Sequence, residues 1–283
     1  MAKLIDGKII ANNIIQNIAL KTEKLSSRKP CLAVIQVGND PASSSYIKQK
    51  ELASIRAGFD FRHITLPTNI TEHELLTTIE ECCNDNALDS LLVQLPLPKH
   101  ICPNKIVCRI TSDKDADGFH PYNMGCLFYG INNIGPCTPL GILRLLEHTQ
   151  VDISGMHAVI VGASNIVGKP LIPLLLAKNT TVTVCHKFTK NLHKHVAMAD
   201  ILISATGNTN AINANNIKEN AIIIDVGINF VDGKLVGDLD QEIVKQKASW
   251  YTPVPGGVGP MTVAMLIENT WKSYLNTFSQ TAI

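Results

Sequence analysis

The sequence has no marked excess of charge of either sign and no long hydrophobic run. Its 25 lysines and arginines nearly balance its 24 acidic residues, and the basic residues are dispersed along the chain. A nucleic-acid or anionic-membrane partner would require clustered positive charge, so the sequence predicts neither. A membrane-spanning helix needs about 20 consecutive apolar residues, and every apolar run here is shorter. The first residues, 1–7, lack the apolar core of a secretion signal.

Cysteine and histidine spacings typical of metal or redox sites are also missing. The eight cysteines are scattered without a C-x-x-C motif, and the adjacent Cys82 and Cys83 are the only close pair. Adjacent cysteines seldom bridge, so we expect free thiols in a reducing cytoplasm. The nine histidines show no ligand spacing, and His193 and His195 are interpreted as the solvated start of a helix. The sequence therefore predicts no metal site.

What the sequence does contain is an alternation of strand and helix patterns. With 283 residues it is too long for one small core, which indicates two domains. Alternating elements of this kind predict an α/β fold with parallel sheets. The polar segment 113–130, with charges and glycines, is interpreted as the crossover between domains. Strands are expected over 31–37, 61–66, 90–95, 157–161, 180–185, 201–204 and 221–226, and helices over 7–25, 43–57, 72–83, 139–147, 166–178 and 261–278.

The segment 157–170, HAVIVGASNIVGKP, is the centre of the second half of the chain. A short β-branched strand runs into Gly162, and a helix follows. This layout directs free N–H groups at a helix N-terminus towards a phosphate. The spacing is not the G-x-G-x-x-G fingerprint, because the next glycine is Gly168. The segment therefore predicts a nucleotide site, with an ordinary tight turn as the alternative.

The next strand, 180–185, bears on which nucleotide would bind. In NAD enzymes an acidic residue at this strand end holds the ribose hydroxyls. Here the strand is followed by His186 and Lys187, with no acidic residue before Asp200. A lysine attracts a 2′-phosphate, so the sequence favours NADP, unless Lys187 is only a solvated loop residue. The turns 205–207 and 227–229 follow later strands and are expected at the same edge of the sheet.

Five polar residues in the first half form a candidate catalytic set. Tyr46 and Lys50 are four apart on an expected helix, and Gln94 ends an apolar strand. A buried lysine can act as a base that a glutamine orients. Asp115 and Asp117 could accept N–H groups of a heterocycle, or could simply shape a turn. Y-x-x-x-K also marks short-chain dehydrogenases, but there it follows the nucleotide turn, whereas here it precedes it. Surface decoration is the alternative for the tyrosine and lysine.

One further segment, 252–262, is too rich in proline and glycine for a helix or strand, so we expect a shaped loop or else a linker. At this point the chain resembles the bifunctional methylenetetrahydrofolate dehydrogenase/cyclohydrolase family. Six segments occur in the family's order and at its spacing: 46–50 (YIKQK), 92–98 (LVQLPLP), 114–121 (KDADGFHP), 136–139 (PCTP), 162–168 (GASNIVG) and 252–262 (TPVPGGVGPMT).

The resemblance implies two reactions. The first is oxidation of 5,10-methylenetetrahydrofolate by NADP to 5,10-methenyltetrahydrofolate, and the second is hydrolysis to 10-formyltetrahydrofolate, which supplies purine and formyl-methionine synthesis. It implies a folate-binding catalytic domain of residues 1–120, on which the C-terminal helix 261–283 packs, and a Rossmann-like NADP-binding domain of residues 121–260. A cytoplasmic homodimer joined through the nucleotide domain is expected by analogy.

The resemblance also implies roles for individual residues. Lys50 would be the catalytic lysine, chiefly of the hydrolysis, with Gln94 positioning and tuning it. Tyr46 would stack on the folate rings and Asp117 would bind the pterin edge. The loop beside the folate would include Pro255, Gly256 and Gly257, and the cofactor would be bound by Gly162, Ala163, Ser164, Lys187, Ile228 and Thr138.

Three positions depart from the family pattern. Leu52 stands where many members have a second lysine, which bears on the strength of the hydrolysis. Ala116 replaces a valine, and Ala163 replaces an arginine that some members carry, which leaves Lys187 as the expected partner of the 2′-phosphate. The rival interpretations are an NADP-dependent dehydrogenase of a small organic acid and a non-catalytic nucleotide sensor. Neither explains why Lys50, Gln94 and Asp117 occur together.

Overall fold

The computed structural model of the chain describes residues 2–131 and 134–279, which form two units, each with its own sheet. The three-stranded unit comprises Asn12–Cys126, Ile131–Cys137 and Val263–Ile283. The six-stranded unit comprises Met1–Ala11, Leu127–Gly130 and Thr138–Thr262. Helices α1 (Gly7–Thr22) and α10 (Val258–Ser279) have residues in both units.

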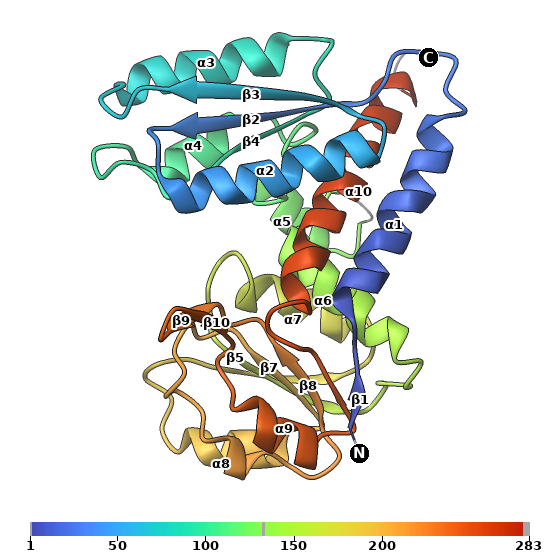
Figure 1. Cartoon of the computed structure of the whole chain (residues 1–283), viewed down its shortest axis with the longest axis vertical. Coiled ribbons are helices and arrows are strands. Elements are labelled where there is room, and N and C mark those ends of the chain that lie inside the picture. The colour runs from blue at the N-terminus through green and yellow to red at the C-terminus, as the bar shows by residue number, and fades with distance from the viewer. Residues whose placement is uncertain (1, 132–133, 280–283) are drawn as a thin grey trace. The chain divides into compact units, whose positions relative to one another are not determined.

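The three-stranded unit is built on a parallel sheet of order β3-β2-β4 (Figure 1). Every residue of β2 is buried, as its mostly apolar sequence predicts, including the polar Gln36. Leu75 and Ile79 of α3 and Ile106 of α4 pack against Ile35 and Val93 of the sheet. The elements are β2 (Cys31–Val37), α2 (Pro41–Arg56), β3 (Asp60–Leu66), α3 (Glu72–Asn84), β4 (Ser90–Val93), α4 (Pro103–Arg109) and α5 (Pro121–Phe128).

The six-stranded unit has a parallel sheet of order β1-β11-β8-β7-β5-β6. Its strands are β1 (Lys3–Leu4), β5 (His157–Val161), β6 (Thr181–Cys185), β7 (Ile201–Ser204), β8 (Ile222–Asp225) and β11 (Trp250–Tyr251). A separate antiparallel hairpin consists of β9 (Asn229–Val231) and β10 (Lys234–Val236). The helices are α6 (Cys137–His148), α7 (Gly168–Leu176), α8 (Leu192–Met198) and α9 (Gln241–Lys247), with a short 3₁₀ turn, η1 (Ala214–Asn216).

The register of the second sheet brings four strand ends together. Val161 is paired with both Cys185 and Ser204, and Ser204 is paired with Asp225. Because these strands are parallel, the segments that follow β5, β6, β7 and β8 all leave the same edge of the sheet. In open parallel sheets this carboxyl edge is where ligands bind.

The parallel α/β fold expected from the sequence is confirmed, and the bounds of β2, β5 and β7 are those expected. Other boundaries differ by a few residues; the strand expected over 90–95 ends at Val93, and the helix expected over 166–178 begins only at Gly168. The polar segment 113–130 proves to contain α5, whose buried side chains are Asn123 and Cys126. Short elements such as α4, α9 and β9–β11 were not expected, since few apolar residues mark them.

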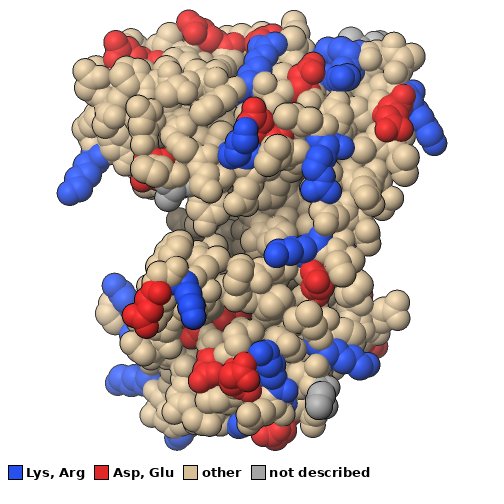
Figure 2. Space-filling model, viewed as in Figure 1, with Lys and Arg blue, Asp and Glu red and all other residues tan. Residues whose placement is uncertain are grey.

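The surface is mixed in charge, as the composition predicts. Figure 2 shows basic and acidic side chains interspersed over the face in view, without a large patch of one sign. Within residues 2–131 and 134–279, no helix has the length and apolar character needed to span a membrane.

Candidate functional site

In the three-stranded unit, α2 and the end of β4 bring Lys50 and Gln94 together. The helix begins where Asp40 accepts the Ser43 N–H at 2.7 Å, next to Pro41. Ten residues along the helix from Asp40, the Lys50 ammonium donates to Gln94 Oε1 at 3.0 Å. The sequence placed these two residues on separate elements, and the contact between them is a tertiary one.

The orientation of the Gln94 amide follows from its other contacts. Its backbone N–H donates to the Ile35 carbonyl at 2.8 Å, which continues the pairing beyond the end of β4. Its side-chain Nε2 donates to the Leu95 carbonyl at 2.7 Å. Because the nitrogen is engaged there, the oxygen is the atom presented to Lys50. The amide therefore fixes the ammonium through a single acceptor.

Asp117 reaches the same edge because residues 114–116 run beside β4. The Leu91 N–H donates to the Lys114 carbonyl at 2.7 Å, and the Ala116 N–H donates to the Leu91 carbonyl at 3.1 Å. Asp117 lines a small cavity of about 20 Å³ whose other lining is mostly apolar, including Leu95. Burial raises the pKa of the Asp117 carboxyl, and the nearby Lys50 charge acts in the opposite direction.

The two aspartates of this segment differ in what they contact. The buried Asp115 carboxylate accepts the His120 N–H at 2.7 Å, the Asn123 Nδ2 at 2.9 Å and the Gly118 N–H at 3.2 Å. Burial raises the pKa of the Asp115 carboxyl, while the hydrogen bonds from the His120 N–H and the Asn123 amide counter the rise. Asp115 thus shapes the turn, the alternative considered from the sequence, whereas Asp117 makes no side-chain hydrogen bond to the described residues 2–131 and 134–279. Asp117 is the carboxylate left for a ligand.

Tyr46 and Leu52 lie on α2 on either side of Lys50. Tyr46 is 44% exposed, so its ring is available for stacking. Leu52, at the position of the family's second lysine, is 50% exposed on the helix. The structure therefore brings Lys50, Gln94 and Asp117 to one edge of the sheet, with Tyr46 one helical turn before the lysine.

Cys137 and Asn269 support this set, and the sequence analysis did not identify them. The Asn269 side-chain Nδ2 donates to the Ala116 carbonyl at 3.0 Å and to the Gly135 carbonyl at 2.8 Å. The Cys137 N–H donates to the Asp117 carbonyl at 3.2 Å. Burial raises the pKa of the Cys137 thiol well above its usual value, so the group stays neutral. Asn269 could have been noticed in the sequence, because it is a polar residue on the otherwise apolar face of the final helix.

In the six-stranded unit, the glycine turn after β5 requires glycine at two positions. Gly162 has φ +125°, and a Cβ there would overlap the Ala205 carbonyl. A Cβ at Gly168 would overlap the Gly162 carbonyl, so the first turn of α7 packs directly on the turn. Ser164 is exposed; its hydroxyl accepts the Val167 N–H at 3.1 Å. The turn leaves an open backbone cradle before a helix N-terminus, which fits a phosphate group.

The other residues expected at the cofactor also lie in this unit. Lys187 follows β6, is exposed, and has its ammonium 5.0 Å from the ring centroid of Phe188. Ile228 is 46% exposed after β8. The Thr138 hydroxyl is 2.9 Å from the Thr262 hydroxyl, and Ala163 is partly buried in the turn.

The segment 252–262, which was expected to be a loop, packs against the start of α1 in the six-stranded unit. Pro255 is exposed, whereas Gly256 and Gly257 are buried. The Gly256 carbonyl accepts the Lys8 N–H at 3.1 Å, and a Cβ at Gly7 would overlap the Gly257 carbonyl. Residues 252–257 are therefore a packed loop, and the alternative of a linker does not hold. The expectation that all of 252–262 is non-helical is wrong for its last five residues, because α10 begins at Val258 and Pro260 lies in its first turn, where no helical N–H donor is needed.

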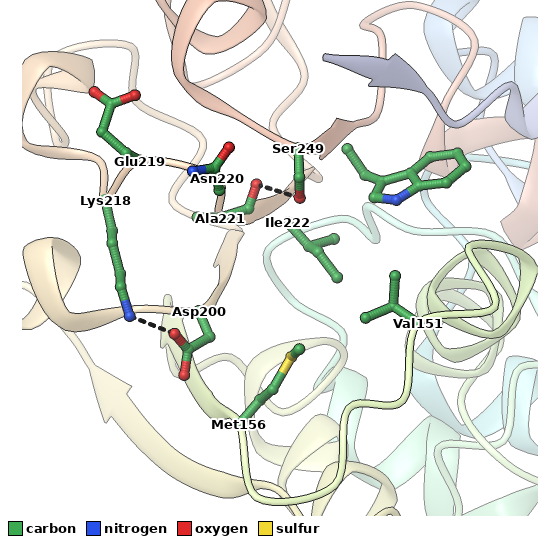
Figure 3. A pocket seen from close by; sticks show the side chains of 10 residues that line it. Val151, Met156, Asp200, Lys218, Glu219, Asn220, Ala221, Ile222 and Ser249 are labelled. Atoms are coloured by element: carbon green, nitrogen blue, oxygen red, sulfur yellow. Dashed lines mark hydrogen bonds and ion pairs between the residues drawn. The ribbon is translucent and has the colours of Figure 1, made fainter. Parts of the chain in front are cut away.

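A separate cavity of the six-stranded unit lies away from this edge. It measures about 300 Å³ and sits where β8 and β11 begin, at Ile222 and Trp250. Figure 3 shows the ion pair of Lys218 and Asp200 on its lining, opposite apolar side chains. It opens at the amino ends of the strands, so it is not the candidate nucleotide site. It is lined by Val151, Met156, Asp200, Lys218, Glu219, Asn220, Ala221, Ile222, Ser249 and Trp250.

A dinucleotide-type parallel sheet with a glycine cradle, together with a lysine–glutamine–aspartate set on another sheet, defines a two-domain nucleotide-dependent enzyme. The particular family follows from comparison with known proteins. Residues 5–117 match the catalytic domain of tetrahydrofolate dehydrogenase/cyclohydrolase, and residues 136–278 match its NAD(P)-binding domain. The chain belongs to the tetrahydrofolate dehydrogenase/cyclohydrolase family.

Individual relatives agree over nearly the whole length. The chain is 49% identical to the bifunctional protein FolD of Bacillus pumilus, over 98% of this chain and 99% of that protein. It is similar to the crystal structure of the FolD methylenetetrahydrofolate dehydrogenase/cyclohydrolase of Campylobacter jejuni, with a TM-score of 0.95, 47% identity, and coverage of 98% of this chain and 99% of that one. The Trypanosoma brucei enzyme, solved with NADP and an inhibitor, has a TM-score of 0.93 and 34% identity, with 98% of each chain covered.

These findings confirm the family, the two-domain α/β fold class and the pair of enzyme activities expected from the sequence. The match to an NAD(P)-binding domain also confirms the expected kind of cofactor. The roles of single residues stay predictions.

Proposed function

We propose that this chain oxidises 5,10-methylenetetrahydrofolate with NADP and then hydrolyses the methenyl product to 10-formyltetrahydrofolate. The observation that carries the proposal is the contact of the Lys50 ammonium with Gln94, beside the partly buried Asp117 carboxylate. Membership of a family named for both activities supports it.

In the oxidation, the protein's task is to orient the substrate. The NADP cofactor supplies the hydride acceptor, which leaves binding and alignment to the side chains. Asp117 accepts N–H groups of the pterin edge, and Tyr46 stacks on its ring system. Departure of a hydride from the methylene carbon leaves the methenyl cation, which is conjugated with two nitrogens. The raised pKa of Asp117 is lowered again when donors or cations come close.

In the hydrolysis, the substrate is already an electrophile. Water adds to the methenyl carbon and loses a proton, after which the bond from that carbon to N5 breaks and N5 takes up a proton. The Lys50 nitrogen accepts the proton from the attacking water and returns it to N5, and the hydroxyl of the adduct loses its proton as the formyl C=O forms. Gln94 holds the Lys50 nitrogen on the reacting side, since its own amide is fixed by the Leu95 carbonyl. The single proton released overall passes to solvent.

The cofactor contacts are proposed on the carboxyl edge of the six-stranded sheet. Gly162, Ala163 and Ser164 would border the phosphates, because the backbone there is open and precedes a helix. Lys187 would attract a 2′-phosphate, and no carboxylate within residues 186–199 opposes it. Ile228 and Thr138 complete the proposed contacts; Ile228 offers an exposed apolar surface for the nicotinamide.

The proposal extends to organisation. The proposed division assigns residues 1–120 with 261–283 to folate and 121–260 to NADP. It is supported by the grouping of the final helix, from Val263 on, with the three-stranded unit, whereas the first eleven residues group with the six-stranded unit. A homodimer through the nucleotide domain is supported by the exposed apolar Phe230 and Val231 on β9. A cytoplasmic location suits eight cysteines that are all free thiols. Light scattering on purified protein tests the dimer.

A paired assay tests the activities. Methenyl formation from 5,10-methylenetetrahydrofolate is followed with NADP and with NAD, and methenyl decay is followed separately on supplied methenyltetrahydrofolate. The Lys50→Met variant is expected to lose hydrolysis by about 100-fold or more, since a positioned base contributes roughly 10²–10⁴-fold. Lys48→Met, on the exposed side of the same helix, is the matched control and should retain both activities.

A charge reversal tests the choice of cofactor. Lys187→Glu should raise the KM for NADP by about tenfold or more through repulsion of the 2′-phosphate, and should leave the KM for NAD nearly unchanged. Lys190→Glu, on a nearby exposed lysine, controls for net charge. Equal turnover with NADP and NAD in the wild type would remove the argument for Lys187, and no turnover with either cofactor would overturn the proposed oxidation.

A further inference from the structure

The order of the strands indicates where the two halves of a dinucleotide would lie on the six-stranded unit. The glycine turn follows β5, and the strand on one side of it is β6, which leads to Lys187. On the other side are β7 and then β8. With pyrophosphate at the turn and the 2′-phosphate near Lys187, the nicotinamide half extends over the ends of β7 and β8. The segments after these two strands therefore form its platform.

One buried carboxylate, Asp238, holds both segments of this platform. Its oxygens accept the Thr206 N–H at 2.7 Å, the Asn208 N–H at 3.1 Å and the Ser204 hydroxyl at 2.9 Å. They also accept the Asn229 side-chain Nδ2 at 3.0 Å. The donors come from the end of β7, the turn after it and the start of β9. Asp238 is 1% exposed, so it acts on a ligand only through these groups.

A second buried carboxylate, Asp225 at the end of β8, fixes Asp238 in turn. Its oxygens accept the backbone N–H groups of Gly227, Asp238 and Leu239, each at 3.0 Å. Its own N–H donates to the Thr252 hydroxyl at 2.8 Å. Asp225 thereby ties the segment containing Ile228 to the segment that carries Asp238. Two side chains 13 residues apart in sequence thus form one connected hydrogen-bond network under the platform.

Two glycines make room for the carboxylates. A Cβ at Gly227 would overlap the Asp238 carboxylate, and a Cβ at Gly237 would overlap the Asp225 carboxylate. The Asp238 carboxylate therefore lies against the backbone of Gly227, and the Asp225 carboxylate lies against the backbone of Gly237. This close fit leaves little freedom for either side chain, so the platform geometry depends on both.

We propose that Asp238, held by Asp225, is a positioning residue for the nicotinamide half of the cofactor. It sets the backbone of the turn after β7 and the start of β9, and so aligns the nicotinamide for hydride transfer. This inference rests on the proposed cofactor site and adds residues that touch no ligand. It predicts a selective effect: loss of Asp238 weakens binding of the nicotinamide half, whereas binding of the adenosine half, at the ends of β5 and β6, is unaffected.

The test compares binding of NADP with binding of its adenosine fragment, 2′,5′-ADP, by calorimetry on the full-length protein. In Asp238→Asn, an amide NH₂ replaces an oxygen that now faces N–H donors, so the platform must shift. The Kd for NADP is expected to rise by about tenfold, within the range for loss of bonds to a charged group. The Kd for 2′,5′-ADP should stay within about twofold, and hydrolysis of supplied methenyltetrahydrofolate should be unchanged.

Asp232→Asn is the matched control, because Asp232 lies exposed in the turn between β9 and β10 and keeps a positive φ that asparagine tolerates. If Asp238→Asn does not fold, Ser204→Ala replaces it in the test, because this variant removes only one of the donors to Asp238. Its Kd for NADP is expected to rise by about threefold. Equal weakening of both ligands, or none, would overturn the inference. Failure of the wild type to bind either ligand would instead overturn the proposed cofactor site.

Discussion

At the scale of single residues, the catalytic proposal depends on one hydrogen bond. Gln94 presents an oxygen to Lys50 because its nitrogen donates to the Leu95 carbonyl. In Gln94→Leu the ammonium loses this acceptor and gains rotational freedom. We expect the rate constant of hydrolysis to fall by about 10- to 100-fold, with a smaller effect on oxidation.

The measurement is the pH–rate profile of methenyl hydrolysis in both proteins. Gln49→Leu, an exposed neighbour on α2, is the control for loss of a glutamine. A profile of Gln94→Leu that matches the wild type in height and shape would show that Gln94 does not act on Lys50.

Asp225 gives a second prediction at this scale. Burial raises the pKa of this carboxyl from 3.8 to about 6, with the neighbouring Asp238 adding to the rise and three backbone N–H groups opposing it. Between these two values the folded protein binds more protons than the unfolded chain, so stability falls as pH rises through this window. The difference of about two pKa units corresponds to roughly 3 kcal/mol at most.

Asp225→Asn cannot titrate, so its stability should lack this slope. Urea unfolding of both proteins from pH 4 to pH 7.5 measures the effect. Relative to the variant, the wild type should lose about 2–3 kcal/mol over that range. Parallel pH dependences of the two proteins would mean that Asp225 is not protonated near pH 6.

At the scale of elements, the junction of β5 and α7 is the most constrained. A Cβ at Gly168 would overlap the Gly162 carbonyl, so Gly168→Ala must displace the helix start or the turn. Overpacking of this kind costs about 1–3 kcal/mol, and the cradle for phosphate should be lost with it. Urea unfolding and NADP titration measure the two consequences.

Gly125→Ala is the natural comparison, because it is also a helical glycine and an added Cβ would meet no atom within 4 Å. It should be neutral, or stabilise the protein by up to about 1 kcal/mol through helix propensity. If Gly168→Ala behaved like Gly125→Ala, the close approach of α7 to the turn would be wrong.

At the scale of the whole molecule, thiol reactivity tests the packing of both units at once. Of the eight cysteines, all free, Cys102 and Cys108 are exposed and Cys82 and Cys83 are half-buried. Burial raises the pKa of the Cys31, Cys137 and Cys185 thiols, which keeps them protonated and slow. A thiol reagent should therefore modify two groups rapidly in the native protein.

The count should rise to eight after unfolding in denaturant, in keeping with the free thiols. In Cys102→Ser/Cys108→Ser the rapid phase should disappear. More than four rapidly reacting groups in the native wild type would contradict the burial of the remaining cysteines.

The elements that sequence patterns predict well are those with their own apolar signature. β2, β5 and β7 are mostly apolar runs with one polar residue each, closed by turns, and their bounds were as expected. The helix α5 was not predicted from apolar spacing because its buried face includes the polar Asn123, whose side chain donates to the Asp115 carboxylate. Asp225 and Asp238 were not identified from the sequence, because their shared hydrogen-bond network joins segments only through the fold.

The sequence by itself determined the order of the main strands and helices, the glycine turn after the strand 157–161, the family, and the residue types available for catalysis. These are local properties, set by apolar periodicity and backbone freedom. Only the tertiary structure decided that Asp115 accepts three hydrogen bonds within a turn while Asp117 makes no side-chain hydrogen bond to the described residues, that Gln94 contacts Lys50, and that Asp238 binds the segments of the proposed nicotinamide platform. Each of these depends on contacts between elements, and such contacts are set by how sheets and helices pack rather than by spacing along the chain.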